Sequence, residues 1–265
     1  MKKGNTIFFK SKPRIRSYAA ICGSKEREGV IGGYADITLT DDMYGESTYE
    51  KAECKILSNA ISLAVEKGAL TDADIDVMFS GDLLNQIISA SFAARDFQFP
   101  FLGLYSACST MSEGILLAAA MTDGGYAENC VAATGSHFAS AERQYRYPLE
   151  LGCTRPPQSQ WTVTGAGACV ISAHSGDIAV VNATLGRVRD WGVSDVNNMG
   201  AAMAPAAADT ILRHFNDTQT SPEDYDIIVT GDLGALGSRI LKDLTWEKGY
   251  DISSNHVDCG EIIYK

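Results

Sequence analysis

The chain contains one segment twice, at positions 150 residues apart. The segment DIDVMFSGDLL at 74–84 matches DYDIIVTGDLG at 224–234, with shared Asp, Gly-Asp and Leu positions and conservative apolar replacements between them. Both copies predict a buried strand that ends in Gly-Asp, and a run with helical apolar spacing precedes each copy, at 49–68 and 200–217. A duplication of this kind constrains the fold strongly, because both halves have to build the same supersecondary structure.

Strands and helices alternate around the two copies. Opening strands are predicted at 14–23 and 177–188. After the first Gly-Asp pair, the pattern predicts helix 83–97, buried strand 100–108, helix 110–122, strand 127–135 and strand 164–172. This alternation predicts parallel βαβ units in a layered α/β architecture, with a first half at 1–175 and a second half at 176–265.

The second half is shorter than the first. From Asp82 the chain runs 91 residues to Ala173, whereas only 33 residues follow Asp232. We therefore expect a second half that is incomplete at its C-terminal side, with unpaired sheet edges. Self-association into a homodimer is the expected way to cover them.

Composition excludes several classes of function. The net charge of −11 disfavours nonspecific attraction to nucleic acid or anionic lipid, which needs clustered Lys and Arg. No apolar stretch reaches the roughly 18 to 20 residues of a transmembrane helix, and no signal core follows the first residues, so a cytosolic origin is expected. The seven cysteines are scattered without a CxxC pair, which indicates neither a disulfide framework nor a metal site.

The stretch LYSACSTMSEG at 104–114 places Cys108 where a strand is predicted to turn into a helix. Thr110 and Glu113 fit a capping box, which predicts that the helix starts just after Cys108. A helix N-terminus lowers the pKa of a thiol and offers backbone N–H groups to an anion, so the position suits an attacking thiolate and a docked carboxylate equally. A buried structural thiol is the competing interpretation.

Other polar residues follow predicted strands. Asp82 and Asn85 come after the first Gly-Asp strand, at the edge where open α/β sheets place ligands, although Asp82 is equally suited to cap its own helix. His137 follows strand 127–135 and is either a packed histidine or a pocket residue.

Two arginines form a further candidate. Arg143 and Arg146 are three residues apart, so they can share a helix face and present forked donors to a dicarboxylate. Pairing with Glu142 or Glu150 on a solvated face is the alternative.

The repeat, with a cysteine at the start of a helix, resembles the thiolase and ketoacyl-synthase fold. Seven motifs are similar, in order, to the stage V sporulation protein AD (SpoVAD) family: SGDLLNQ, YSACSTMSEG, SHFASAERQYRYPLELG, TVTGAGACVIS, MGAAMAPAAADTI, YDIIVTGDLGALGS and HVDCGEIIY. The resemblance implies an α/β fold of two pseudo-repeated βαβαβαββ halves in a layered αβαβα architecture, the second half truncated.

The resemblance also implies a function. Members of this family are noncatalytic subunits of the SpoVA complex that bind dipicolinic acid or its calcium chelate, for uptake into the developing spore and release in germination. They are held peripherally at the spore inner membrane by other SpoVA membrane proteins. The resemblance implies no cofactor and no resident metal, since any calcium arrives with dipicolinate.

Condensing enzymes of this fold combine an acyl-accepting cysteine with a His and a second His or Asn. Ketosynthase III-type relatives carry the first His just after the strand equivalent to YDIIV, where this chain has Thr230, Gly231 and Asp232. His256 is interpreted as a packed or surface residue rather than a substitute base. We therefore predict a binding pocket, with an acyltransferase or condensing enzyme using Cys108 as the alternative. The predicted ligand-binding residues are Asp82, Asn85, Cys108, Ser109, Thr110, His137, Arg143 and Arg146.

Overall fold

A computed structural model describes residues 1–145, 156 and 158–264 of the chain. The chain divides into two units. The larger unit comprises Phe9–Gly152 and Thr162–Val181, and the smaller unit comprises Met1–Phe8, Cys153–Trp161 and Asn182–Lys265. No helix in the described part of the chain is both long enough and apolar enough to cross a bilayer.

The larger unit is built on one mixed sheet with the strand order β4-β3-β8-β7-β5-β6, and β9 also pairs with β3. The strands are β3 (Arg14–Cys22), β4 (Ile37–Thr38), β5 (Val77–Gly81), β6 (Phe101–Gly103), β7 (Asn129–Ser136), β8 (Gly165–Ser172) and β9 (Ile178–Ala179). Strand β5 pairs in parallel with both β6 and β7, as predicted. Strand β8 runs antiparallel to β3 and to β7, so the sheet as a whole is mixed.

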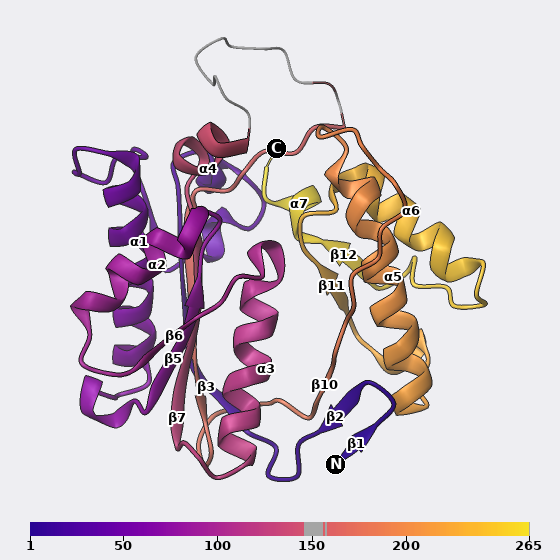
Figure 1. Cartoon of the computed structure of the whole chain (residues 1–265), viewed down its shortest axis with the longest axis horizontal. Coiled ribbons are helices and arrows are strands. Elements are labelled where there is room, and N and C mark those ends of the chain that lie inside the picture. The colour runs from indigo at the N-terminus through magenta and orange to yellow at the C-terminus, as the bar shows by residue number, and fades with distance from the viewer. Residues whose placement is uncertain (146–155, 157, 265) are drawn as a thin grey trace. The chain divides into compact units, whose positions relative to one another are not determined.

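Helices cover both faces of this sheet. Figure 1 shows α1 (Tyr49–Lys67) and α2 (Ile88–Ala93) on one face and α3 (Thr110–Asp123) on the other. The predicted helix at 49–68 is confirmed as α1: Thr48 caps its start by accepting from the backbone N of Lys51. Its inward side chains include Ile56, Leu57 and Ile61, which are fully buried and contribute about 1.5–3 kcal/mol each.

Two predictions for the larger unit were only partly right. The helix expected at 83–97 is broken, because Gln86 and Ile87 adopt left-handed backbone angles and only α2 is regular helix. The strand expected at 100–108 is reduced to β6, and its Leu102 is 52% exposed. In the described residues β6 pairs with β5 alone, so it is an edge strand and not a buried one.

The smaller unit contains two separate sheets. Strands β1 (Lys2–Lys3), β2 (Thr6–Phe8) and β10 (Asn182–Thr184) form an antiparallel sheet, and β11 (Ile228–Thr230) pairs in parallel with β12 (His256–Asp258). The helices are α5 (Met199–Thr218), α6 (Gly234–Trp246) and α7 (Cys259–Ile262). The predicted strand at 177–188 is wrong as a single element, because it divides into β9 and β10, which belong to different sheets.

The sequence repeat is also a repeat of local structure. Thr71 and Asp74 form a reciprocal capping box before β5, and Ser221 and Asp224 form the same box before β11. Each of these strands then pairs in parallel with the strand that follows it on its sheet edge, β6 or β12.

The second copy departs from the first in its burial. The whole of β5 is buried, whereas Ile227 and Val229 are each 56% exposed. The prediction of a buried strand is therefore wrong for the second copy. Ile227 and Val229 are two residues apart and share one face of the strand, which is the exposed one, whereas Ile228 points to the other face and packs against the apolar core of the smaller unit.

Candidate functional site

Cys108 lies in a short 3-10 turn, Ala107–Ser109, between β6 and the start of α3. The predicted position at a strand-to-helix turn is confirmed. Ala107 has φ 45°, a left-handed conformation that non-glycine residues rarely adopt and that often accompanies functional turns. The turn presents Cys108 as an exposed residue, so the interpretation as a buried structural thiol is wrong.

The predicted capping box at this helix is wrong by one residue. The cap position belongs to Ser109, so Glu113 stands fourth in the helix and not third. The Ser109 hydroxyl instead donates to the backbone O of Ser106 at 3.1 Å. Among the described residues, Thr110 Oγ1 and Glu113 Oε2 are buried and have no hydrogen-bond partner. The start of α3 is therefore left without a side-chain cap.

Asp82 anchors the start of α2. Its Oδ1 accepts from the backbone N of Leu84 and its Oδ2 from that of Ala90, both at 2.7 Å. Burial raises the pKa of Asp82, and the hydrogen bonds from Ala90 and Leu84 oppose that rise. Asp82 is thus not the N-cap residue of α2, which is Ile87, although its carboxylate accepts a hydrogen bond from the first turn of that helix. Asn85 is exposed, and its backbone N donates to Gln144 Oε1 at 3.0 Å.

His137 is a packed histidine. Its ring is buried, with Nε2 2.8 Å from the backbone O of Asp42 and Nδ1 3.1 Å from the backbone N of Ala139. Since a backbone N–H donates to Nδ1, the ring proton is on Nε2 and is donated to Asp42. The side chain also packs on Tyr49, with ring centroids 5.1 Å apart. Both nitrogens are occupied by structural contacts.

Arg143, in α4 (Phe138–Tyr145), forms an ion pair with Glu50 of α1. Arg143 therefore pairs with Glu50 rather than with its neighbour Glu142, which is buried and whose Oε1 accepts from the backbone N and the hydroxyl of Thr162. Arg146 and Glu150 lie outside the described residues, so the forked pair of arginines stays a prediction.

The larger unit buries acidic side chains that no sequence motif pointed to, among them Glu26 and Glu53. Glu53 is almost fully buried in α1, and Ser140 donates to its Oε2 at 2.5 Å. Burial raises the pKa of Glu53 to about 8, and the nearby carboxylate of Asp82 adds to the rise. The signal was present in the sequence, since Glu53 lies on the same helix face as Ile56 and Leu57, three and four residues later.

In the smaller unit, His256 is packed rather than exposed. Its Nε2 lies 2.8 Å from Thr230 Oγ1, and its Nδ1 lies 3.4 Å from Ser238 Oγ. Burial lowers the pKa of His256. Thr230 donates its own proton to Oδ1 of the fully buried Asp258, so the Nε2–H of His256 donates to Thr230.

Gly231 follows β11, between Thr230 and Asp232, in the stretch where the resemblance to ketosynthase III-type enzymes leads us to expect a histidine in those enzymes. A Cβ atom placed on Gly231 would meet no atom of the described residues within 4 Å. The position therefore has room for a side chain, but glycine supplies no group that transfers a proton. The loop that follows is held by Asp258, which accepts from the backbone N of Leu233, Gly234 and Gly260.

Comparison with known sequences identifies relatives across nearly the whole chain. The family model described as stage V sporulation protein AD matches residues 3–265. The stage V sporulation protein AD of Bacillus subtilis (strain 168) is 46% identical over 250 residues, which cover 94% of this chain and 74% of that protein.

Comparison with solved structures shows the fold. A variant of OleA from Xanthomonas campestris has a TM-score of 0.65 at 13% identity, covering 96% of this chain and 86% of OleA. The 3-oxoacyl-[acyl-carrier-protein] synthase III of Aquifex aeolicus VF5 has a TM-score of 0.59 at 13% identity, covering 94% and 85%. These are thiolase-like condensing enzymes, so the predicted thiolase-like fold is confirmed. At such low identity the likeness concerns the fold alone.

Proposed function

Because the chain belongs to the stage V sporulation protein AD family, we propose that it acts in sporulation as a noncatalytic binding protein for dipicolinic acid or its calcium chelate. In this proposal it serves the SpoVA complex in uptake of dipicolinate into the developing spore and its release in germination. Other SpoVA membrane proteins hold it at the spore inner membrane. Calcium enters the site as part of the ligand.

The uncapped start of α3 is the observation that carries the binding proposal. The backbone N–H of Thr110 donates to the O of Ala107, and no side-chain cap at Ser109 serves the N–H groups that follow among the described residues. The buried hydroxyl of Thr110 has no hydrogen-bond partner there either. Helix N-termini with available N–H groups bind carboxylates, and dipicolinate has two.

The histidines support the noncatalytic part of the proposal. Thioester chemistry at Cys108 needs a group that transfers protons or polarises a carbonyl. His137 and His256 both use their ring nitrogens in structural contacts, and Gly231 has no side chain. An acyltransferase or condensing enzyme is the second candidate, favoured by the exposed Cys108 beside the left-handed Ala107.

Titration calorimetry with calcium dipicolinate and with sodium dipicolinate tests the binding proposal. We expect saturable binding by the wild type and about tenfold weaker binding by Thr110→Val, because one hydrogen bond contributes about 0.5–1.5 kcal/mol. Thr122→Val is the matched control, since Thr122 lies at the other end of α3 and bonds within the helix. Equal affinities for all three proteins, or an absence of binding, would overturn the proposal.

Incubation with acyl-CoA, followed by intact-mass measurement, separates the two candidates. We expect no acyl adduct and no turnover. An adduct on the wild type that is lost in Cys108→Ala, together with turnover lost in the same variant, would establish the enzyme instead.

A further inference from the structure

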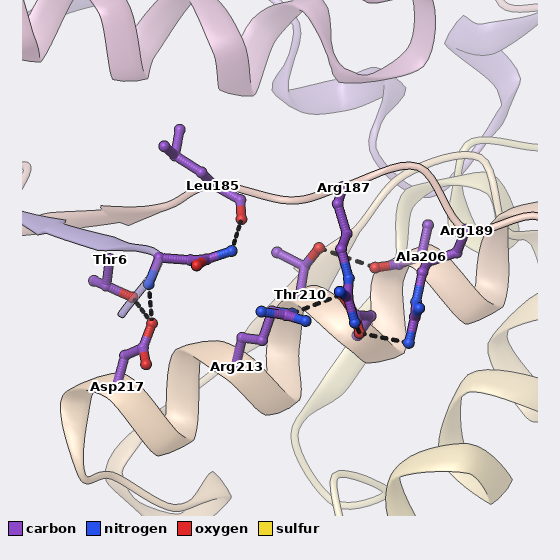
Figure 2. Close-up of polar contacts among 10 residues, drawn as sticks. Thr6, Leu185, Arg187, Arg189, Ala206, Thr210, Arg213 and Asp217 are labelled. Atoms are coloured by element: carbon purple, nitrogen blue, oxygen red, sulfur yellow. Dashed lines mark hydrogen bonds and ion pairs between the residues drawn. The ribbon is translucent and has the colours of Figure 1, made fainter. Parts of the chain in front are cut away.

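Three arginines converge on one carboxylate in the smaller unit. Arg187 Nε lies 3.0 Å from Asp209 Oδ2, Arg213 Nε lies 2.8 Å from the same oxygen, and Arg189 Nη2 lies 2.9 Å from Asp209 Oδ1. Arg187 Nη2 donates a further bond to Oδ1, so that its contact is bidentate. Figure 2 shows the three guanidinium groups gathered along one side of α5.

Local chain geometry brings the arginines together. Arg187 and Arg189 alternate on the segment that follows β10, and both contact Asp209. Asp209 and Arg213 are four residues apart on α5, where side chains share a face. Gly186 approaches the same helix closely, since a Cβ on it would lie 2.9 Å from the hydroxyl oxygen of Thr210.

The cluster carries an uncompensated positive charge. Its hydrogen bonds and ion pairs place four N–H donors around Asp209, about as many as a carboxylate accepts. The hydrogen bonds and charges of Arg187 and Arg213 lower the pKa of Asp209 to about 2, so it is ionised at neutral pH. Three cations therefore face one anion, in a chain whose net charge is −11.

The guanidinium groups also remain accessible. The Arg189 side chain is 39% exposed and that of Arg213 is 29% exposed. Each directs one N–H to Asp209 and has further donors in its planar fork. Two such forks can donate to the several oxygens of one tetrahedral anion.

We infer that Arg187, Arg189 and Arg213 form a binding site for a phosphate dianion, either as the free ion or as the head of a small phosphate ester. A dianion matches the surplus of two positive charges, whereas a single carboxylate would leave one uncompensated. The phosphate site uses residues of the smaller unit, whereas the dipicolinate site is proposed at α3 of the larger unit, so the two proposals rest on different residues and either can fail alone.

Titration calorimetry with inorganic phosphate and with glycerol 3-phosphate tests the inference, with sodium chloride at equal ionic strength in the reference buffer. We expect saturable binding by the wild type and at least tenfold weaker binding by Arg189→Gln and Arg213→Gln. Arg239→Gln removes one charge from an exposed position on α6 and should bind as the wild type does. Binding of both probes indicates a free-ion site, whereas binding of the ester alone indicates recognition of its organic part as well.

Arg213→Lys keeps the positive charge but loses the planar set of guanidinium donors. It therefore tests the site if the glutamine variants do not fold. We expect it to fold and to bind phosphate more weakly than the wild type. Absence of saturable binding by the wild type would overturn the inference. Unchanged phosphate affinity in folded Arg189→Gln and Arg213→Gln would also overturn it, and would leave the arginines a purely structural role.

Discussion

The hydroxyl of Ser140 donates a 2.5 Å hydrogen bond to the carboxylate of Glu53 inside the larger unit. The other oxygen of Glu53 has no hydrogen-bond partner among the described residues. A buried carboxylate with one oxygen unsatisfied favours the protonated form, since desolvation penalises the charge. This explains why burial raises the pKa of Glu53 to about 8.

Because the pKa of Glu53 is raised, we predict that the free energy of unfolding falls as pH rises. An unperturbed glutamate titrates near pH 4.5, so between that pH and about 8 the folded state holds a proton that the unfolded state has lost. The stabilisation from this group is fully present below about pH 4.5 and is lost as pH rises through about 8. Asp82 contributes with the same sign, because burial raises its pKa too.

Glu53→Gln should flatten this pH dependence. In the wild type we expect the free energy of unfolding to fall by a few kcal/mol between pH 5 and pH 9, since each pKa unit corresponds to about 1.4 kcal/mol. Urea denaturation followed by circular dichroism at several pH values measures it. Glu66→Gln, at an exposed position of the same helix, is the control and should keep the wild-type slope. A Glu53→Gln slope equal to that of the wild type would show that Glu53 is ionised when folded.

The repeat-related glycines should respond differently to alanine. A Cβ on Gly81 would lie 2.3 Å from the backbone O of Leu104, whereas a Cβ on Gly231 would meet nothing within 4 Å among the described residues. We expect Gly81→Ala to lose about 1–3 kcal/mol of unfolding free energy through overpacking, and Gly231→Ala to change it by about 0.5 kcal/mol or less. Chemical denaturation of the two variants compares them directly, and equal losses would contradict the steric difference.

Asp258 should be essential to the stability of the smaller unit. Its oxygens accept from Thr230 and from the backbone N of Leu233, Gly234 and Gly260. Asp258→Asn replaces one accepting oxygen by an NH2 group, so we expect the free energy of unfolding to fall by about 1–3 kcal/mol for each donor left without an acceptor. Tryptophan fluorescence during urea denaturation reports the smaller unit, because all three tryptophans belong to it. The exposed Asp226→Asn is the control, and a similar effect from both variants would refute the role of Asp258.

The capping boxes before β5 and before β11 should contribute equally to the free energy of unfolding. Thr71→Ala and Ser221→Ala each remove the side-chain half of a reciprocal pair with Asp74 or Asp224. A loss of about 1 kcal/mol is expected for each, as for other N-cap residues. Midpoints of denaturation with urea measure both. A loss at one box and none at the other would mean that the repeat is structural in only one half.

Much of the fold was predictable because its signals are local. The apolar spacing that predicted α1 and α5 is a property of neighbouring residues, and both helices are found where they were expected. The predicted cap of α3 was wrong by a single residue. Ser109 and Thr110 are both suitable cap residues, and only the backbone conformation of the turn selects Ser109.

The candidate site was less predictable because its contacts are distant in sequence. The turn at Cys108 was found from adjacent residues. The partner of Arg143 is Glu50, 93 residues away, and the sequence suggested near neighbours instead. The sequence allows two roles each for Asp82 and His137, and the choice depends on backbone groups that their loops bring into contact.

The sequence by itself determined the duplicated order of strands and helices, and the turn that carries Cys108, because periodicity and turn chemistry are encoded in adjacent residues. Only the tertiary structure decided that β8 runs antiparallel, that Glu53 is buried, and that three arginines meet at Asp209. Those outcomes depend on which distant segments pack together, and so on desolvation and charge pairing that a linear pattern does not specify.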